Sequence, residues 1–144
     1  MYESQAGAML TSSPTSSAKP VYNLEQRTFL FAQGVRQFAE KFPKNHWYRE
    51  DIKQVVRSAG SVAANYIEAN ESVGKRDFKM RIGICLKEAK ESRLWLNLLD
   101  GKSDRLENDR KKLANEADQL VRIFSAAIRT LRAKNAKKEM TTVA

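Results

Sequence analysis

The residues that could take part in chemistry gather in one short stretch, SVAANYIEANESVGKRDF, at positions 61–78. It places Asn65 and Glu68 ahead of the pair Gly74 and Lys75. Carboxylates beside a Gly-Lys pair could bind a metal ion or a nucleotide, because carboxylate oxygens ligate hard cations and Gly-Lys loops surround phosphates. One helix ending and another beginning would produce the same letters. The rest of the chain has to decide between a reactive site and a corner.

The phosphate-loop interpretation fails on spacing. Such a loop requires a second glycine five residues before the glycine of the Gly-Lys pair, and a Ser or Thr directly after the lysine. Ala69 and Arg76 occupy those two positions. The sequence therefore argues against a nucleotide site of this kind.

A metal site is equally unsupported. A carboxylate-bridged site in a helical bundle needs inward Glu residues together with Glu-x-x-His pairs, and His46, the single histidine, falls in an expected loop. Lys87 and Lys90 interleave with Glu88 and Glu91, which is typical of a solvated ion-pair surface. We expect no metal and no cofactor.

The nucleophilic side chains are isolated from any base. Cys85, the single cysteine, falls on an expected core face, and Ser58 and Ser61 have no nearby histidine, so no acyl-transfer site can be assembled. We therefore expect that the protein is not an enzyme. A lone cysteine also forms no intrachain disulfide, which indicates a buried, reduced thiol and a cytoplasmic protein.

Four segments show the periodicity of amphipathic helices. The predicted helices run over residues 24–42, 50–70, 75–99 and 103–134. No strand alternation competes with this pattern, and connections of a few residues force sequential helices to lie antiparallel. The sequence predicts an all-α fold, an antiparallel up-down-up-down four-helix bundle.

The bundle is expected to occupy residues 23–134 of the 144 in the chain. Residues 1–22 are rich in Ser, Thr and Pro and lack the order of a signal peptide, so we expect a disordered tail there. Residues 135–144 are expected to form a frayed basic tail. No apolar run reaches the roughly 20 residues that span a bilayer, so no membrane partner is expected.

The chain is basic, with 26 Lys and Arg against 17 Asp and Glu and a formal net charge of +9. Such a field favours polyanions or acidic protein surfaces. Cations that point away from the expected core form ridges that could neutralise phosphates without reading sequence. These candidate nucleic-acid-binding residues are Lys53, Arg57, Arg76, Lys79, Lys87, Lys90, Lys111, Arg122 and Arg129. Any soluble helix also presents a charged outer face, so both interpretations stay open here.

The third predicted helix carries more apolar surface than one core needs. Ile84, Trp95 and Leu98 fall on a flank about 100° away from the face that holds Phe78 and Cys85. Soluble monomers seldom leave such a patch exposed, so the flank predicts a subunit interface, although a single aromatic could instead pack under a loop.

The segment QVVRSAGSVAANYIEAN, followed by KRDFKMRIGICLKEAKESRLWLNLL, resembles the four-helix-bundle family encoded in 23S rRNA intervening sequences. The resemblance covers about residues 25–131 and includes the FPKN corner. It implies a small bacterial bundle that assembles into a homopentameric ring, in a family whose function is mostly unassigned. Accessory proteins of diversity-generating retroelements are distantly similar, and these basic pentamers bind a reverse transcriptase and nucleic acid.

No residue that the resemblance carries over has an established catalytic role in the family. The matching positions are Arg57, Ser58, Asn65, Glu68, Asp77, Phe78, Lys87, Glu88 and Ala89. Where members commonly place Ser ahead of Lys-x-Asp-Phe, this chain has Gly74, so the helix start loses a side-chain acceptor and Asp77 must help alone. We therefore expect Asn65, Glu68, Gly74 and Asp77 to form a structural corner.

The leading hypothesis is a non-enzymatic, basic, oligomeric protein that associates with RNA or DNA through phosphate contacts. The alternative is a protein-interaction scaffold that uses the flank of Ile84, Trp95 and Leu98 to hold an acidic partner, with no nucleic-acid role.

Overall fold

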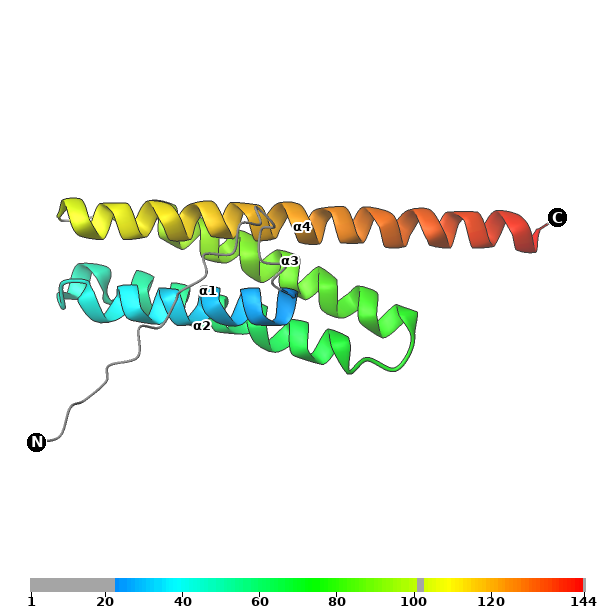
Figure 1. Cartoon of the computed structure of the whole chain (residues 1–144), viewed down its shortest axis with the longest axis horizontal. Helices are drawn as coiled ribbons and strands as arrows, with labels where there is room; N and C mark the ends of the chain where they lie inside the picture. The colour runs from blue at the N-terminus through cyan, green and yellow to red at the C-terminus, as the bar shows by residue number, and fades with distance from the viewer. Residues whose placement is uncertain (1–22, 101–102, 144) are drawn as a thin grey trace, which may run out of the picture.

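The computed structural model describes residues 23–100 and 103–143, and these contain four helices and no strand. The helices are α1 (Leu24–Lys41), α2 (His46–Asn70), α3 (Lys75–Leu98) and α4 (Asp104–Thr142). Consecutive helices pack against each other, and α1 also contacts α4, so the four close around one core. Figure 1 shows the four helices packed lengthwise and α4 extending beyond the other three. The predicted all-α fold with four helices is confirmed, whereas the predicted tail over residues 1–22 lies outside the described residues.

The core is built from the apolar positions that recur at helical spacing on all four helices. The largest fully buried side chains include Phe38, Phe124, Ile82, Leu96, Leu99 and Leu120. Burying a side chain of this size stabilises a fold by about 1.5–3 kcal/mol relative to leaving it in water. No helix within the described ranges has the length and apolar character needed to cross a membrane.

Side-chain caps set the starts of three helices. The side chain of Asn23 accepts a hydrogen bond from the backbone N–H of Gln26 at 2.8 Å, and Ser103 accepts from Leu106 at 3.2 Å. Asn45 accepts from the N–H groups of Trp47 and Tyr48 and starts α2 at His46. The prediction that this helix begins near residue 50 was wrong, because His46–Arg49 add a first turn. In this turn only Tyr48 packs against the core and the other three side chains are exposed, so it carries no apolar period.

The end of α4 also differs from the prediction. The helix continues to Thr142, through residues that we expected to belong to a frayed tail beginning at 135. Ile128 is its last buried side chain, and every side chain from Arg132 to Val143 is exposed. Adding residues to an existing helix needs no new nucleus, so α4 can run on without packing.

The stretch at 61–78 forms the corner between α2 and α3. The N–H of Glu71 donates to the carbonyls of Ile67 and Glu68, both at 3.2 Å, and so closes α2. Gly74 then starts α3 at φ +89°, without a side-chain cap. This positive φ accounts for a glycine where the resemblance suggested serine, because a side chain strains the backbone in this region.

Candidate functional site

The residues that could have formed a reactive centre are buried in structural contacts between α2 and α3. The hydroxyl oxygens of Ser58 and Ser92 lie 2.8 Å apart, and both side chains are fully buried. The Cys85 thiol donates to the carbonyl of Val62 at 3.7 Å, and burial raises the pKa of this thiol to about 12. A protonated thiol without access to solvent is a poor nucleophile.

The carboxylates of α3 are engaged by one arginine of α2. Arg57 donates to Glu91 at 2.5 Å and to Glu88 at 3.4 Å. The hydrogen bond with Glu91 is the largest cause of the raised pKa of Arg57. Among the residues that the structure describes, no three His, Cys, Asp or Glu side chains gather in a way that could hold a metal ion.

The corner residues that we singled out are also joined by an arginine. Arg81 of α3 donates to Asn65 at 3.4 Å and forms an ion pair with Glu68 at 2.6 Å. Asp77 lies in the first turn of α3, where a carboxylate is stabilised by the positive end of the helix dipole. This arrangement ties the end of α2 to the start of α3.

The positive charge is concentrated on two of the four helices. α3 carries seven Lys and Arg against three Asp and Glu, and α4 carries ten against six, which leaves +4 on each. α1 carries three against two, and α2 three against three. Polyanions are therefore attracted most strongly to the surface formed by α3 and α4.

The candidate nucleic-acid-binding residues fall into two groups. Arg57 is held by Glu88 and Glu91, and Arg122 pairs with Asp118 at 3.1 Å. The others make no ion pair with any described residue. These are Lys53, Arg76, Lys79, Lys87, Lys90, Lys111 and Arg129, of which Lys79 is half-buried and the rest are exposed.

Asp118 stands at the junction of α3 and α4. It accepts a hydrogen bond from Arg93 at 2.8 Å and another from Arg122. These two guanidinium groups, Arg93 first, hold the pKa of Asp118 below its usual value. Asp118 therefore neutralises one of the two positive charges with which it pairs.

The predicted flank on α3 is divided by the structure. Leu98 is 56% exposed and Ile84 is half-buried, but Trp95 packs against the core. The Trp95 Nε1 atom is buried and has no hydrogen-bond partner within the described part of the chain. Leu98 and, in part, Ile84 therefore remain accessible to another protein, whereas Trp95 contributes to the core.

Sequence reasoning missed two further members of this surface. Met80 and Leu94 are 53% and 51% exposed. Together with Ile84 and Leu98 they form what we call the α3 stripe. The signal that could have found them is their spacing from the two predicted residues. Met80 precedes Ile84 by four positions and Leu94 precedes Leu98 by four, which keeps each pair on one helix face.

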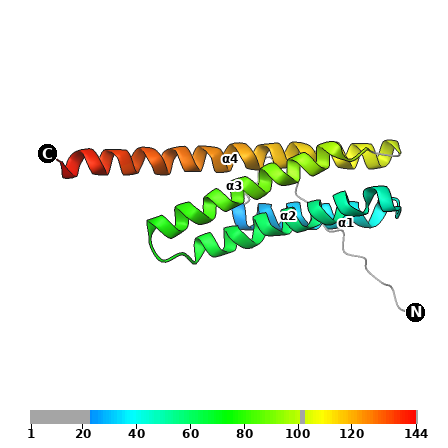
Figure 2. The ribbon, with the colours of Figure 1, turned by 180° about the vertical axis from the view of Figure 1, so that it is seen from behind.

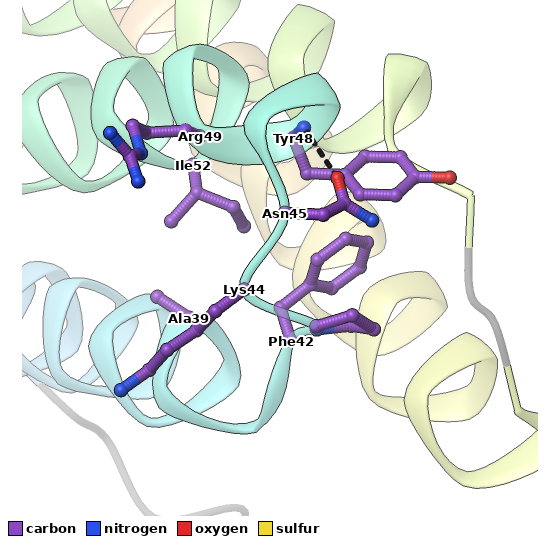
Figure 3. Close-up of a pocket in the computed structure, with 8 residues that line it drawn as sticks. Ala39, Phe42, Lys44, Asn45, Tyr48, Arg49 and Ile52 are labelled. Carbon is purple, nitrogen blue, oxygen red and sulfur yellow. Dashed lines mark hydrogen bonds between the residues drawn. The ribbon is translucent and has the colours of Figure 1, made fainter.

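A pocket of about 260 Å³ opens at the corner between α1 and α2 (Figure 3). Phe42 and Tyr48 meet edge to face in it, with ring centroids 4.9 Å apart. Lys44 and Arg49 also line it, and the lining contains no carboxylate, no thiol and no hydroxyl of Ser or Thr. We assign no chemistry to it.

Comparison with known proteins agrees with the resemblance. The model of the 23S rRNA-intervening sequence protein family matches residues 22–126. A crystal structure from Bacteroides thetaiotaomicron, of a protein of unknown function in the S23 ribosomal protein family, has a similar fold. It superposes with a TM-score of 0.65 at 23% identity, over 74% of this chain and 98% of that one. No match was found among curated proteins. On the family match, this chain belongs to the 23S rRNA-intervening sequence protein family.

Proposed function

We propose that the protein is a non-enzymatic cytoplasmic protein that associates with RNA or DNA through phosphate contacts, without strong sequence readout. The observation that supports this most directly is the set of cations on α3 and α4 that have no acidic partner among the described residues. A Lys or Arg that is already paired gains little from a phosphate, whereas an unpaired one releases a counterion from the nucleic acid when it binds.

The test is the binding of labelled RNA and DNA across a salt series, followed by fluorescence anisotropy. Binding through phosphates requires that the logarithm of the affinity fall linearly with the logarithm of the salt concentration, by about 0.9 for each contact on duplex DNA. Affinity that does not depend on salt, or no binding at low salt, would contradict the proposal.

A pair of double variants locates the binding surface. Lys87→Gln with Lys90→Gln removes two unpaired charges from α3, and we expect it to reduce the salt slope by about 1.8. Arg36→Gln with Arg49→Gln removes the same charge from exposed positions on α1 and α2 and is the matched control. Equal salt slopes for both variants would show that binding depends on the net charge of the protein and not on a surface of α3.

The proposal includes assembly into a homopentameric ring of antiparallel bundles. The α3 stripe supports self-association, because three of its large apolar side chains, Met80, Leu94 and Leu98, are exposed on one helix face. A ring would repeat the cationic surfaces of α3 and α4 around an axis and strengthen their field. The mass measured by light scattering at several protein concentrations tests the number of subunits.

The same stripe favours a second candidate function, that of a scaffold that holds an acidic protein partner. Helical spacing places Lys87 on the face of the stripe, between Ile84 and Leu94, and Lys90 beside it. Both would complement acidic side chains of such a partner. A single stoichiometric partner that survives nuclease treatment and is lost with Leu98→Ser would favour the scaffold over the nucleic-acid role.

A further inference from the structure

The last part of α4 has no packing role in the described chain. In both Figure 1 and Figure 2, the C-terminal end of α4 stands clear of the other three helices. Every side chain of residues 132–142, which we call the α4 arm, is exposed. The arm is nevertheless helical to Thr142. Its sequence is therefore free to serve a partner.

The chemistry of α4 changes where the arm begins. The face that buries Leu120 and Phe124 continues through Leu131, and helical spacing then places Lys134 and Lys138 on it. Lysine in place of leucine ends the apolar seam. The arm therefore does not continue the core, and an apolar partner helix would find cations where it needs a hydrophobic surface.

The charge of the arm indicates that its partner is negatively charged. Arg132, Lys134, Lys137 and Lys138 stand against Glu139 alone, which leaves +3 over eleven residues. No ion pair involves any of these side chains among the described residues. An exposed helix with unpaired charges of one sign fits a polyanion.

The shape of the arm selects among nucleic acids. Eleven residues at a rise of 1.5 Å extend about 16 Å, and a helix with its side chains is about 10–12 Å wide. The major groove of B-form DNA is about 12 Å wide and admits such a helix. The A-form groove of duplex RNA is too narrow and deep.

We propose that the α4 arm lies in the major groove of double-stranded DNA and that its lysines contact the phosphates that border the groove. This rests on the proposed function and adds to it the form of the nucleic acid and the element that binds it. The arm is preformed as a helix, so binding does not have to order it first. Its side chains need not read bases, because phosphate contacts position a helix without sequence preference.

The experiment compares three full-length variants with the unsubstituted protein. The arm variant carries Lys134→Gln, Lys137→Gln and Lys138→Gln, since Gln is nearly as good a helix former as Lys. The rescue variant carries Arg at these three positions. The control variant carries Arg36→Gln, Lys44→Gln and Arg49→Gln, which removes the same charge from exposed sites outside α4. Circular dichroism verifies that helix content is kept.

Each protein is titrated, over a salt series, into a DNA duplex of two helical turns, an RNA duplex and a single DNA strand. All three have the same number of nucleotides per strand. We expect the DNA duplex to bind most tightly. For the DNA duplex, the salt slope of the affinity should be lower by about 2.7 for the arm variant than for the unsubstituted protein, from three lost contacts at about 0.9 each. The rescue variant should keep the slope, and the control variant should change it by less than about 1.

Three results would overturn the inference, each in a different way. If no nucleic acid binds at low salt, the proposed function fails together with the arm. If DNA binds but the arm and control variants have equal slopes, the proposed function stands and the arm is not the binding element. If the RNA duplex binds as tightly as the DNA duplex, the assignment to the B-form groove is wrong.

Discussion

At the scale of single residues, Gly74 holds the corner between α2 and α3 through its backbone alone. Residues that carry a side chain rarely adopt its φ of +89°, yet a Cβ at this position would meet no atom within 4 Å. We predict that Gly74→Ser lowers the free energy of unfolding by about 1–3 kcal/mol from backbone strain, although serine is a good helix cap. Urea denaturation measures the change.

The neighbouring residue supplies the control for this prediction. Val73 is 92% exposed in the same turn and has a negative φ, so Val73→Ser should leave the unfolding free energy nearly unchanged. A Gly74→Ser protein as stable as the unsubstituted one would mean that the corner can adopt another backbone conformation.

The buried thiol of Cys85 predicts a dependence of stability on alkaline pH. Its pKa is raised from 9.0 to about 12 in the folded protein, chiefly by burial. Between these values the unfolded chain loses the proton and the folded one keeps it, so stability is full below about pH 9 and falls as the pH rises towards 12.

We expect the unfolding free energy to fall more steeply between pH 9 and 11 in the unsubstituted protein than in Cys85→Ala, as urea titrations at each pH will show. The variant retains all other groups that titrate in this range, so the difference isolates the thiol. Rapid labelling of the native protein by a thiol reagent at pH 8 would contradict the burial on which the prediction depends.

At the scale of the elements, apolar periodicity in the sequence predicted the positions of the helical segments that pack on the core. Phe31, Val35 and Phe38 recur on one face, so the place of α1 follows from their spacing alone. The start of α2 carried no such period, and its signal was the cap at Asn45. The end of α4 was not predictable from packing, because nothing packs there and continuation depends on helix propagation.

The candidate surfaces were predictable in part for the same reason. Helical spacing identifies which side chains share a face, and it placed Ile84 and Leu98 together. Spacing cannot report which neighbouring helix covers the edge of that face. For this reason Trp95 was grouped with the exposed residues although it packs on the core.

The exposed end of α4 leads to a prediction about truncation. Among the residues that the structure describes, a chain that ends after Leu131 loses only exposed side chains, so its unfolding free energy should stay within about 0.5 kcal/mol of the full chain. A chain that ends after Phe124 also loses the buried Ile128 and should be destabilised by at least about 2 kcal/mol.

Urea denaturation of both truncated proteins checks this. If the cut after Leu131 is as costly as the cut after Phe124, then the arm packs against something that the single chain lacks, such as a second subunit. The same comparison at several protein concentrations would reveal such a contact, because the stability of an oligomer depends on concentration.

At the scale of the whole molecule, α3 carries both the apolar stripe and unpaired cations such as Lys87 and Lys90. Subunits that join through the stripe would bring these cations close together. Salt screens like-charge repulsion but weakens phosphate contacts. We therefore predict that rising salt increases the mass in light scattering while it lowers the affinity for nucleic acid, and a mass that falls with salt would contradict this.

The assembly itself is best tested at Leu98. Trp95→Ala should also weaken association, but it removes a side chain that packs on the core, so a loss of mass could follow from a loss of stability. Leu98 is 56% exposed, and Leu98→Ser should reduce the mass in light scattering without lowering the unfolding free energy of the monomer. Val73→Ser removes an exposed apolar side chain away from the stripe and should leave the mass unchanged. An unchanged mass for Leu98→Ser at the lowest detectable protein concentration would place the subunit contact elsewhere, because truncating a large apolar side chain that is desolvated in an interface weakens association.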